Sequence, residues 1–248
     1  FEEVSPYNSI DPERLNNTKE SFKNGANEID NYINSISKNS DELVLMDAGC
    51  ANGEFIYFLS KKYPSMRKVG VDLTESFIKV ANQLKIKNSN FISDDLFEYS
   101  NKNKNKFDIV TSFSVVQIFK EPDAILKCLF NMLKPGGLLI AHGCFNPHNV
   151  SVNIRFKDDS IPQTKGVWRS DFNQHSYLSI EENAALYSDS WKIKEFDFNA
   201  DIPKKEGAPA INNWTETLSN GKRIIVNGAN IINHKAYLIA IKNKYNRK

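Results

Sequence analysis

The fold of this chain is set by LVLMDAGCANGEFIYFL, residues 43–59. Its first four residues form an apolar run that is too short for a helix and is bounded by a turn, which predicts a buried strand of an α/β sheet. Gly49 and Gly53 then let the backbone turn sharply and approach a ligand closely, because neither carries a side chain. Helix-forming residues follow from Glu54. The stretch predicts a strand, a glycine turn and a helix whose free N–H groups face any ligand above the turn.

The residue before the glycine turn separates two kinds of ligand. A dinucleotide site requires G-x-G-x-x-G, which rests a pyrophosphate on the helix N-terminus. This chain instead has Asp47 ahead of Gly49, Ala51 and Gly53, and a carboxylate repels a phosphate but suits a cationic group such as an ammonium. The pattern resembles the first motif of class I S-adenosylmethionine-dependent methyltransferases, D-x-G-x-G-x-G, with Ala51 in place of the middle glycine. The resemblance implies S-adenosylmethionine as cofactor and S-adenosylhomocysteine as its product, and it disfavours an NAD-dependent enzyme.

Composition describes an ordinary soluble globule. The 248 residues are 40% hydrophobic and 25% charged, and 32 basic against 30 acidic residues give a net charge of +2. Nucleic acids and anionic membranes call for a strongly basic face, so neither is expected as a partner. No apolar run approaches the length of a membrane span. The three cysteines have no metal-ligand spacing, which favours a reducing, cytoplasmic location and predicts no metal.

Acidic residues at the ends of the next two predicted strands continue the pattern. The run RKVGVD reads as a strand that ends in Asp72, roughly twenty residues past the glycine turn, where a carboxylate can accept two hydrogen bonds from a ribose diol. The alternative is an aspartate that caps its own turn. Residues 90–93 form a third strand, and the resemblance implies that the acidic residue after it holds the adenine amino group while the next backbone N–H meets the ring. Asp95 followed by Leu96 fits that role better than Asp94.

The succession FDIV…LKPGGLLIAHG is highly typical of the same family. It predicts a fourth strand at 107–112, a helix at 123–133, a Pro-Gly-Gly turn and a fifth strand at 138–141. The resemblance places the methionine end of the cofactor, and one side of the acceptor, against the segment after the fourth strand. The cofactor-binding residues are therefore expected to be Asp47, Gly49, Cys50, Ala51, Gly53, Asp72, Leu73, Asp95, Leu96, Phe113 and Ser114.

Alternating strands and helices imply right-handed crossovers and ligands beyond the carboxyl ends of the strands. The fold class is α/β: a Rossmann-like class I methyltransferase fold with a mainly parallel seven-stranded sheet, helices on both faces and an antiparallel last strand. Residues 1–248 are expected to form one domain. Its parts are an irregular arm and a helix that Thr18 caps and that runs to about Ser37 (1–40), the cofactor-binding core (41–143) and acceptor-side insertions (144–178 and 199–234). Ser179 is expected to cap a helix, and 191–198 and 235–241 to supply the last two strands.

The two insertions are dense in aromatic and hydrogen-bonding groups, and loops at this end of a sheet tend to carry function. VWRSDFNQHSY at 167–177 is expected to be part of a loop excursion above the sheet that walls the acceptor pocket, and WTE…NGKRI to form a second wall. The alternative is a surface loop that its aromatic residues anchor to the core. The expected substrate-binding residues are Gln117, Trp168, Arg169, Asp171, Asn173, Gln174, Trp214, Glu216 and Arg223, with Lys222 beside the last.

Methyl transfer is an in-line displacement for which the protein must hold the acceptor and the methyl group on one axis. A base helps when the nucleophile is a hydroxyl, and a histidine with an ordinary pKa near 6.5 can serve at cellular pH. His175 is the first candidate base and His148 the second, whereas His142 and His234 are expected to be structural. The alternative for a histidine in a loop is a surface role.

The two insertions also look similar to those of small-molecule methyltransferases that act on bacterial surface carbohydrates. We therefore expect a small-molecule acceptor, most specifically a hydroxyl of a carbohydrate or activated sugar of bacterial surface polysaccharide. Three alternatives remain open from the residues: another small-molecule acceptor, a lipid or protein acceptor, and a non-catalytic subunit that binds the cofactor.

Overall fold

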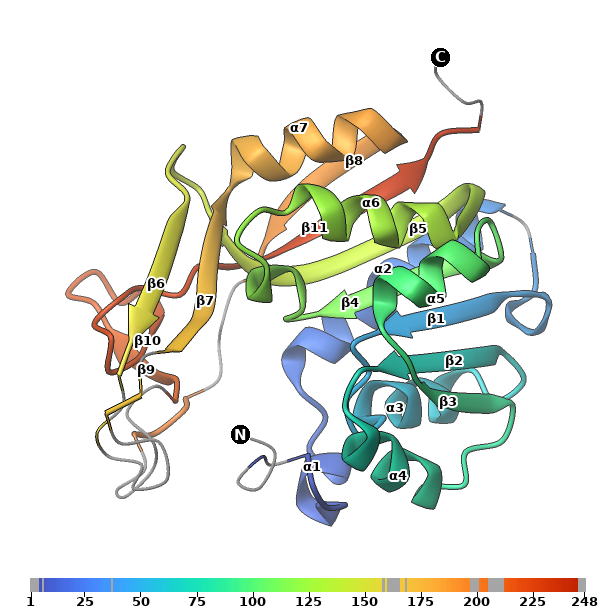
Figure 1. The fold of residues 1–248 in the computed structure, drawn as a ribbon, viewed down its shortest axis with the longest axis horizontal. Coiled ribbons are helices and arrows are strands. Elements are labelled where there is room, and N and C mark those ends of the chain that lie inside the picture. Colours follow the sequence, from blue (N-terminus) through green and yellow to red (C-terminus); the bar gives the residue numbers. More distant parts are fainter. Residues whose placement is uncertain are drawn as a thin grey trace.

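The computed structural model describes residues 5, 7–36, 38–157, 159, 166–167, 169–196, 201–204 and 212–244, with backbone alone for 169–172. Its centre is a nine-stranded sheet in which seven strands run in the order β3-β2-β1-β4-β5-β11-β8 (Figure 1). The five strands from β3 to β5 pair in parallel, while β11 is antiparallel to β5 and β8. The predicted mainly parallel sheet with an antiparallel last strand is confirmed. The strands of this path are Ser89–Ser93 (β3), Arg67–Asp72 (β2), Val44–Ala48 (β1), Phe107–Phe113 (β4), Leu133–Asn146 (β5), Lys235–Lys242 (β11) and Ser188–Glu195 (β8).

Three helices cover one face of the sheet: α2 (Glu20–Ile36), α3 (Glu54–Lys62) and α4 (Glu75–Gln83). Apolar side chains of α2 and α3 form one buried cluster with those of β1, β4, β5 and β11, which is what their three- and four-residue apolar spacing predicts. Gly25 lets α2 approach the sheet closely, because a Cβ atom there would lie only 2.8 Å from Cζ of Phe113. This face carries the strand-end side chains described below.

The opposite face is covered by α5 (Leu96–Lys102), α6 (Asp123–Met132) and α7 (Tyr177–Tyr187) (Figure 1). Their apolar side chains share the second large cluster with the alternate residues of β1, β4, β5 and β11. The central strands are therefore buried on both faces, as parallel strands with helical crossovers usually are. Two short 3₁₀ turns, Ser40–Glu42 (η2) and Val116–Ile118 (η3), precede β1 and follow β4.

The arm and two helix starts differ from the prediction. The arm is not wholly irregular, because Pro12–Asn16 forms a short helix (α1) whose first-turn N–H groups bond to the side chain of Asp11. Helix α2 begins two residues after the predicted cap, Thr18. Helix α7 starts at Tyr177, because Ser176 rather than Ser179 provides the capping oxygen and accepts the N–H of Ser179.

The excursion predicted as a loop at 144–177 is largely strand. β5 continues to Asn146, well past the predicted end at residue 141. Val152–Phe156 (β6) then pairs antiparallel with Arg169–Ser176 (β7), and the end of β7 pairs in parallel with the end of β5. Backbone pairing at the end of β5 satisfies N–H and C=O groups that an excursion would leave open. Further on, Trp214–Thr217 (β9) and Arg223–Val226 (β10) form a separate two-stranded hairpin.

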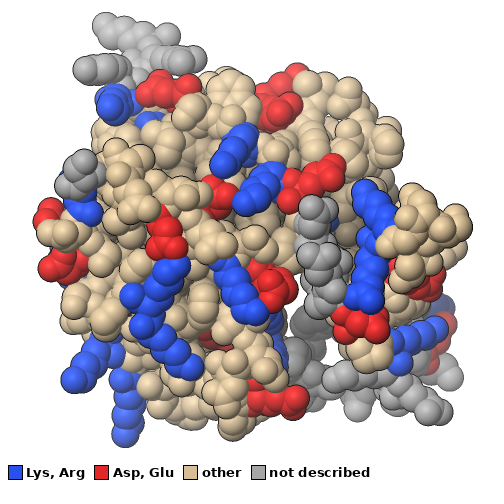
Figure 2. All heavy atoms as spheres, turned by 180° about the vertical axis from the view of Figure 1, so that it is seen from behind, with Lys and Arg blue, Asp and Glu red and all other residues tan. Residues whose placement is uncertain are grey.

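The surface charge is mixed. Figure 2 shows Lys and Arg side chains interspersed with Asp and Glu side chains over the face seen from behind, in keeping with the near balance of charges in the sequence. Across the described part of the chain, no helix has the length and apolar character needed to cross a membrane.

Candidate active site

The site lies at the carboxyl ends of the parallel strands, on the face that α2 and α3 cover. Asp47 on β1, Phe113 on β4 and His142 on β5 come to this end in neighbouring strands. Tyr237 lies opposite His142 on the antiparallel β11. Because β11 runs antiparallel to β5, it starts at the edge of the sheet where β1, β4 and β5 end. All four side chains therefore share this edge.

Asp47 is 3% exposed and accepts a 2.7 Å hydrogen bond from the hydroxyl of Thr111. The pKa of its carboxyl group is raised to about 7, chiefly by burial; the Thr111 hydrogen bond opposes the rise and the nearby Asp72 carboxylate contributes to it. A buried carboxyl group with one hydroxyl donor lacks compensation for its charge. A cationic group above it would supply that compensation, so the site fits the ammonium of an amino acid.

The glycine turn is held in a conformation that side chains resist. Gly49 has φ 73°, and a Cβ atom there would lie 2.3 Å from a methyl carbon of Val115. Ala51, at the position of the middle glycine, has φ 47° and is therefore in the left-handed region despite its side chain. The turn keeps its backbone open toward the ligand side at a small cost in strain.

Asp72 caps its own turn, which is one of the two alternatives that its sequence position suggested. One carboxylate oxygen accepts the N–H of Ala51 and the other the N–H of Thr74, each at 2.9 Å. The aspartate therefore ties β2 to the glycine turn. Each oxygen has a second lone pair, which leaves acceptor capacity for a ribose diol.

A cavity of about 90 Å³ lies over this part of the site. Its lining comes from the glycine turn, from the end of β4, from His142 and from the N-terminal arm: Tyr7, Lys19, Ser21, Phe22, Asp47, Gly49, Cys50, Ala51, Asn52, Glu54, Phe55, Phe113, Ser114 and His142. Binding sites for whole cofactors and other small molecules usually enclose about 300 Å³ or more. The cavity therefore corresponds to one end of a cofactor, and the arm closes it from above.

The arm is fastened by charge. Arg14 and Lys19 both lie 3.0 Å from the carboxylate of Glu54 at the start of α3. The side-chain amide of Asn52 donates to the backbone oxygen of Ser9. Glu54 is buried beneath the arm, and Arg14 and Lys19 are its ion-pair partners there. An entering cofactor has to displace or bypass these contacts.

The residues expected at the adenine end lie outside this cavity. Asp95 caps α5, where one of its oxygens accepts the N–H groups of Phe97 and Glu98. Leu73 is 70% exposed, and Leu96 is half-buried against the core. These residues follow β2 and β3 at the same edge of the sheet as Asp47, so the predicted cofactor set forms one continuous border.

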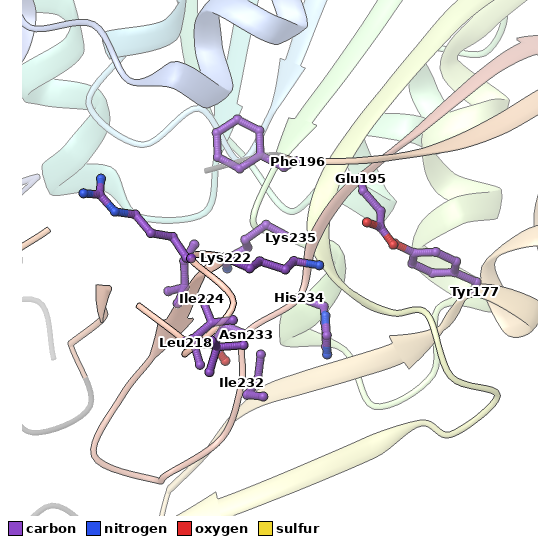
Figure 3. A pocket seen from close by; sticks show the side chains of 13 residues that line it. Tyr177, Glu195, Phe196, Leu218, Lys222, Ile224, Ile232, Asn233, His234 and Lys235 are labelled. Carbon is purple, nitrogen blue, oxygen red and sulfur yellow. The ribbon is translucent and has the colours of Figure 1, made fainter. Parts of the chain in front are cut away.

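A second, larger cavity of about 600 Å³ lies beyond β5 (Figure 3). It is enclosed by the β10 hairpin strand, the turn before β11 and the end of β8. Its lining residues are Tyr177, Glu195, Phe196, Leu218, Gly221, Lys222, Arg223, Ile224, Ile225, Ile232, Asn233, His234 and Lys235. Three permanent cations against one carboxylate give it a basic character, which suits an anionic ligand.

The two cavities are separated by an aromatic contact. The ring of His142, which lines the first, lies 6.0 Å from the ring of Phe196, which lines the second. Lys235 lines the second cavity and lowers the pKa of His142. Two side chains in contact, His142 and Phe196, therefore lie between the two cavities.

Three residues predicted to wall the acceptor or to act as base lie buried on β7. The side-chain amide of Asn173 donates to the carbonyls of Gln117 and Phe119, and that of Gln174 to the carbonyl of Ile232. Nε2 of His175 lies 3.2 Å from the carbonyl of Val116, and the ring is 1% exposed. Gln117 accepts the N–H of Cys144. Asn173 and His175 thus join β7 to the turn after β4, and Gln174 joins it to the segment before β11. The segment is a buried strand, so it is neither the predicted loop excursion nor the alternative surface loop anchored by aromatic residues.

The ring of His175 is also closed off by its burial. Burial lowers the pKa of its imidazole, although hydrogen bonding to the Val116 carbonyl opposes that change. Gln174 and His175 border a different cavity of about 250 Å³, and neither lines the two cavities of the site. His175 therefore lines neither cavity of the site, and its role as base stays a prediction.

The remaining predicted acceptor residues divide. In the predicted second wall, Lys222 and Arg223 line the large cavity. The indole N–H of Trp214 donates to the carboxylate of Glu216 at 3.0 Å, and neither Trp214 nor Glu216 lines that cavity. His148 is exposed, with its ring 6.3 Å from that of His234 at the rim. The other three lie outside what the structure describes: Trp168 entirely, and Arg169 and Asp171 in their side chains.

Sequence reasoning missed His142, Lys235 and Phe196. His142 stands at the end of a predicted strand, as Asp47 does, and that position was the available signal. Lys235 and Phe196 gave none, because their importance depends on how β8 and β11 are placed beside β5. In the described portion of the chain, no group of three His, Cys, Asp or Glu side chains is arranged to hold a metal ion.

Comparison with known proteins agrees with this architecture. Residues 39–190 match the model of a family described as "Methyltransferase domain". Because that match covers more than half of the chain, the chain belongs to this family, within the class I S-adenosylmethionine-dependent methyltransferases that the fold and the strand-end motifs define.

Individual relatives are more distant. The chain is 28% identical over 183 residues to malonyl-[acyl-carrier protein] O-methyltransferase of Priestia megaterium, covering 66% of this chain and 64% of that protein. It is 31% identical over 98 residues to the ubiquinone biosynthesis O-methyltransferase of Coxiella burnetii, covering 38% and 41%. The first alignment thus spans a little less than two thirds of the relative.

Solved structures show the same fold. The plantazolicin methyltransferase BpumL, in a complex with S-adenosylhomocysteine (SAH) and a triazolic desmethylPZN analogue, superposes with a TM-score of 0.56 at 17% identity over 98% of this chain and 87% of that one. The PH0226 protein of Pyrococcus horikoshii gives a TM-score of 0.54 at 19% identity over 98% and 97%. At these identities the likeness is one of fold.

Proposed function

We propose that the protein transfers a methyl group from S-adenosylmethionine to a small polar acceptor that carries negative charge. The observation that carries this proposal is the pair of cavities that meet at His142 and Phe196. The first offers the Asp47 carboxyl group for an ammonium and has Asp72 beside it for a ribose. The second is large enough for a small molecule and is lined by three permanent cations.

The more specific acceptor proposed is a hydroxyl of a carbohydrate or activated sugar of the kind used in bacterial surface polysaccharide. An activated sugar combines hydroxyl groups with a phosphate or diphosphate. Lys222, Arg223 and Lys235 suit the phosphate, and the other end of the molecule then extends toward His142 and the methyl group. Orientation of this kind supplies much of the catalysis in a displacement reaction, because the sulfonium is already activated.

A carboxylate acceptor is the second candidate. The same cations suit a carboxylate, and two similar proteins are named malonyl-[acyl-carrier protein] O-methyltransferases. A carboxylate oxygen has no proton to lose, so its methylation needs no base. The two candidates therefore differ in their requirement for a proton acceptor beside the methyl group.

The first test is calorimetric titration of the protein with S-adenosylmethionine, S-adenosylhomocysteine and NAD. We expect saturable binding of the two sulfur ligands and none of NAD. Folded protein that bound neither sulfur ligand would overturn the proposal at the level of the cofactor.

The second test is SAH release with nucleotide sugars, sugar phosphates, neutral sugars and malonyl thioesters. Lys222→Met should raise KM for a phosphorylated acceptor about tenfold or more, the effect expected for removing a charged hydrogen-bond partner. Lys204→Met is the matched control, because Lys204 lies over the ring of Trp214 and is not part of the cavity lining. Preference for neutral acceptors, or equal effects of the two variants, would refute an anionic acceptor in this cavity.

A further inference from the structure

His142 occupies the boundary between the two cavities. It lies on β5 between Phe113 on β4 and Tyr237 on β11, with ring centroids 5.9 Å and 4.9 Å away. It lines the cofactor cavity beside Ser114, and Phe196 connects it to the basic cavity. A nucleophile that reaches from the basic cavity toward the methyl group has to pass this ring.

Neither ring nitrogen of His142 has a hydrogen-bond partner, although the residue is only 6% exposed. Buried polar atoms in folded proteins are nearly always paired, and leaving one unpaired costs about 1–3 kcal/mol. The buried His175 illustrates the usual outcome, because its Nε2 lies within hydrogen-bond distance of a backbone carbonyl. The unpaired nitrogens of His142 therefore indicate a partner that enters with a ligand.

The surroundings keep His142 uncharged. Burial lowers the pKa of its imidazole to about 3, and the positive charges of Lys235 and Lys19 add to that effect. Tyr237 on β11 packs against the ring, and Asp47 on β1 lines the same cavity. A neutral imidazole has one nitrogen that accepts and one that donates. It can therefore accept the hydrogen of an acceptor hydroxyl.

We propose that His142 is the catalytic residue that receives the proton of the acceptor hydroxyl, an inference that rests on the proposed function. The acceptor oxygen forms its bond to the methyl carbon as the carbon–sulfur bond breaks, and that bond's electron pair remains on sulfur. The hydroxyl proton passes to the free ring nitrogen of His142 and then to solvent. A negatively charged acceptor group beside Lys235 offsets the lysine charge, which favours the protonated ring during the reaction.

Purely structural packing is the competing explanation, because the ring lies among Phe113, Tyr237 and Phe196. The variant His142→Phe separates the two, since it keeps an aromatic ring and removes both nitrogens. We expect SAH to bind His142→Phe within about twofold of wild type, and kcat for a hydroxyl acceptor to fall about 10²- to 10⁴-fold, the usual contribution of general base catalysis. Tyr99→Phe, which keeps a buried ring on α5 outside both cavity linings, is the control and should keep its kcat.

A second readout does not depend on turnover. In protein with ¹⁵N-labelled histidine and bound SAH, adding the acceptor should shift the ring nitrogen signals that are missing from the His142→Phe spectrum. The role of His142 would be overturned if wild type were active and His142→Phe kept the same kcat. It would also be overturned if wild type were active and the acceptor left the His142 signals unshifted. Equal loss of SAH binding and activity in His142→Phe would show packing instead. No turnover by wild type with any hydroxyl acceptor would refute the hydroxyl acceptor of the proposed function, on which this inference rests.

Discussion

The cofactor cavity and the acceptor cavity differ in how the chain assembles them. The cofactor cavity is built around one contiguous turn, with strand ends added at regular points. The acceptor cavity draws its lining from the end of β8, the hairpin strand β10 and the start of β11. The first is therefore defined by local backbone geometry. The second depends on contacts between segments that are distant in the sequence.

The contrast has a chemical side. The cofactor cavity is small and is lined by two buried carboxyl groups, Asp47 and Glu54, whereas the acceptor cavity is larger and basic. A small closed cavity suits a single cofactor. A cavity bordered by loops can be shaped for a particular acceptor, because loops tolerate changes in sequence. Changes to the first should affect the shared chemistry, and changes to the second should affect the choice of acceptor.

The largest effect on cofactor affinity is expected from Asp47→Asn. Replacing the carboxylate that faces the cofactor ammonium should weaken SAH binding about 100-fold or more, because truncating a buried charge pair costs 2–5 kcal/mol. Calorimetry measures the affinity directly. Asp123→Asn, on the exposed start of α6, is the control and should bind SAH normally. Normal affinity in Asp47→Asn would remove Asp47 from the cofactor site.

The pH dependence of SAH affinity should be the next largest effect. In the free protein the pKa of Asp47 is raised to about 7 by burial, so its carboxyl group is protonated below that pH. Binding an ammonium requires the carboxylate. Affinity should therefore fall as pH drops below about 7, by up to tenfold per pH unit.

This dependence should be absent in Asp47→Asn, where calorimetry at a series of pH values should give a flat profile between pH 5 and 7. A wild-type profile that is equally flat in this range would show that the raised pKa of Asp47 plays no part in binding.

A smaller effect is expected at the arm. Glu54→Gln removes the charge that holds Arg14 and Lys19, and should speed SAH dissociation about three- to tenfold, because truncating a buried charge partner acts mainly on the dissociation rate. Stopped-flow displacement measures this rate. Glu75→Gln breaks an exposed pair with Lys79 instead and should leave the rate unchanged. Equal rates in the two variants would show that the arm does not retain the cofactor.

The smallest effect is expected at Ala51. Its φ of 47° costs an alanine about 1–2 kcal/mol, while glycine loses about 0.4–1 kcal/mol through greater freedom in the unfolded chain. Ala51→Gly should therefore raise the free energy of unfolding by about 0.5 kcal/mol in chemical denaturation. Ala48→Gly, in the buried strand β1, should lower it. Destabilisation in both variants would mean that the strain at Ala51 is negligible.

The strand ends show how far the motifs could be used for prediction. Asp47, Asp72 and Asp95 each follow a short apolar run, and all three lie at one edge of the sheet, as expected. That these three residues bind the cofactor remains a prediction. The structure adds that Asp72 also fastens the glycine turn and that Asp95 also caps α5.

The β7 residues show where prediction failed. Asn173, Gln174 and His175 have the polarity of a binding loop, yet they lie in a buried strand and bond to backbone carbonyls. A polar residue that satisfies a distant carbonyl is indistinguishable in sequence from one that faces a ligand, because both require hydrogen-bonding groups. Only the position of the partner separates the two cases.

The sequence alone determined the strand–turn–helix unit, the order of the first five strands and the acidic residues at their ends. Those features follow from local backbone preferences and from hydrophobic periodicity, which neighbouring residues encode. The position of His142 between two cavities, and the meeting of Phe196, Lys222 and Lys235 around one of them, came from the tertiary structure. They depend on the pairing of β11 with β5 and β8, and on the placement of a hairpin, which join segments whose contacts leave no local pattern in the chain.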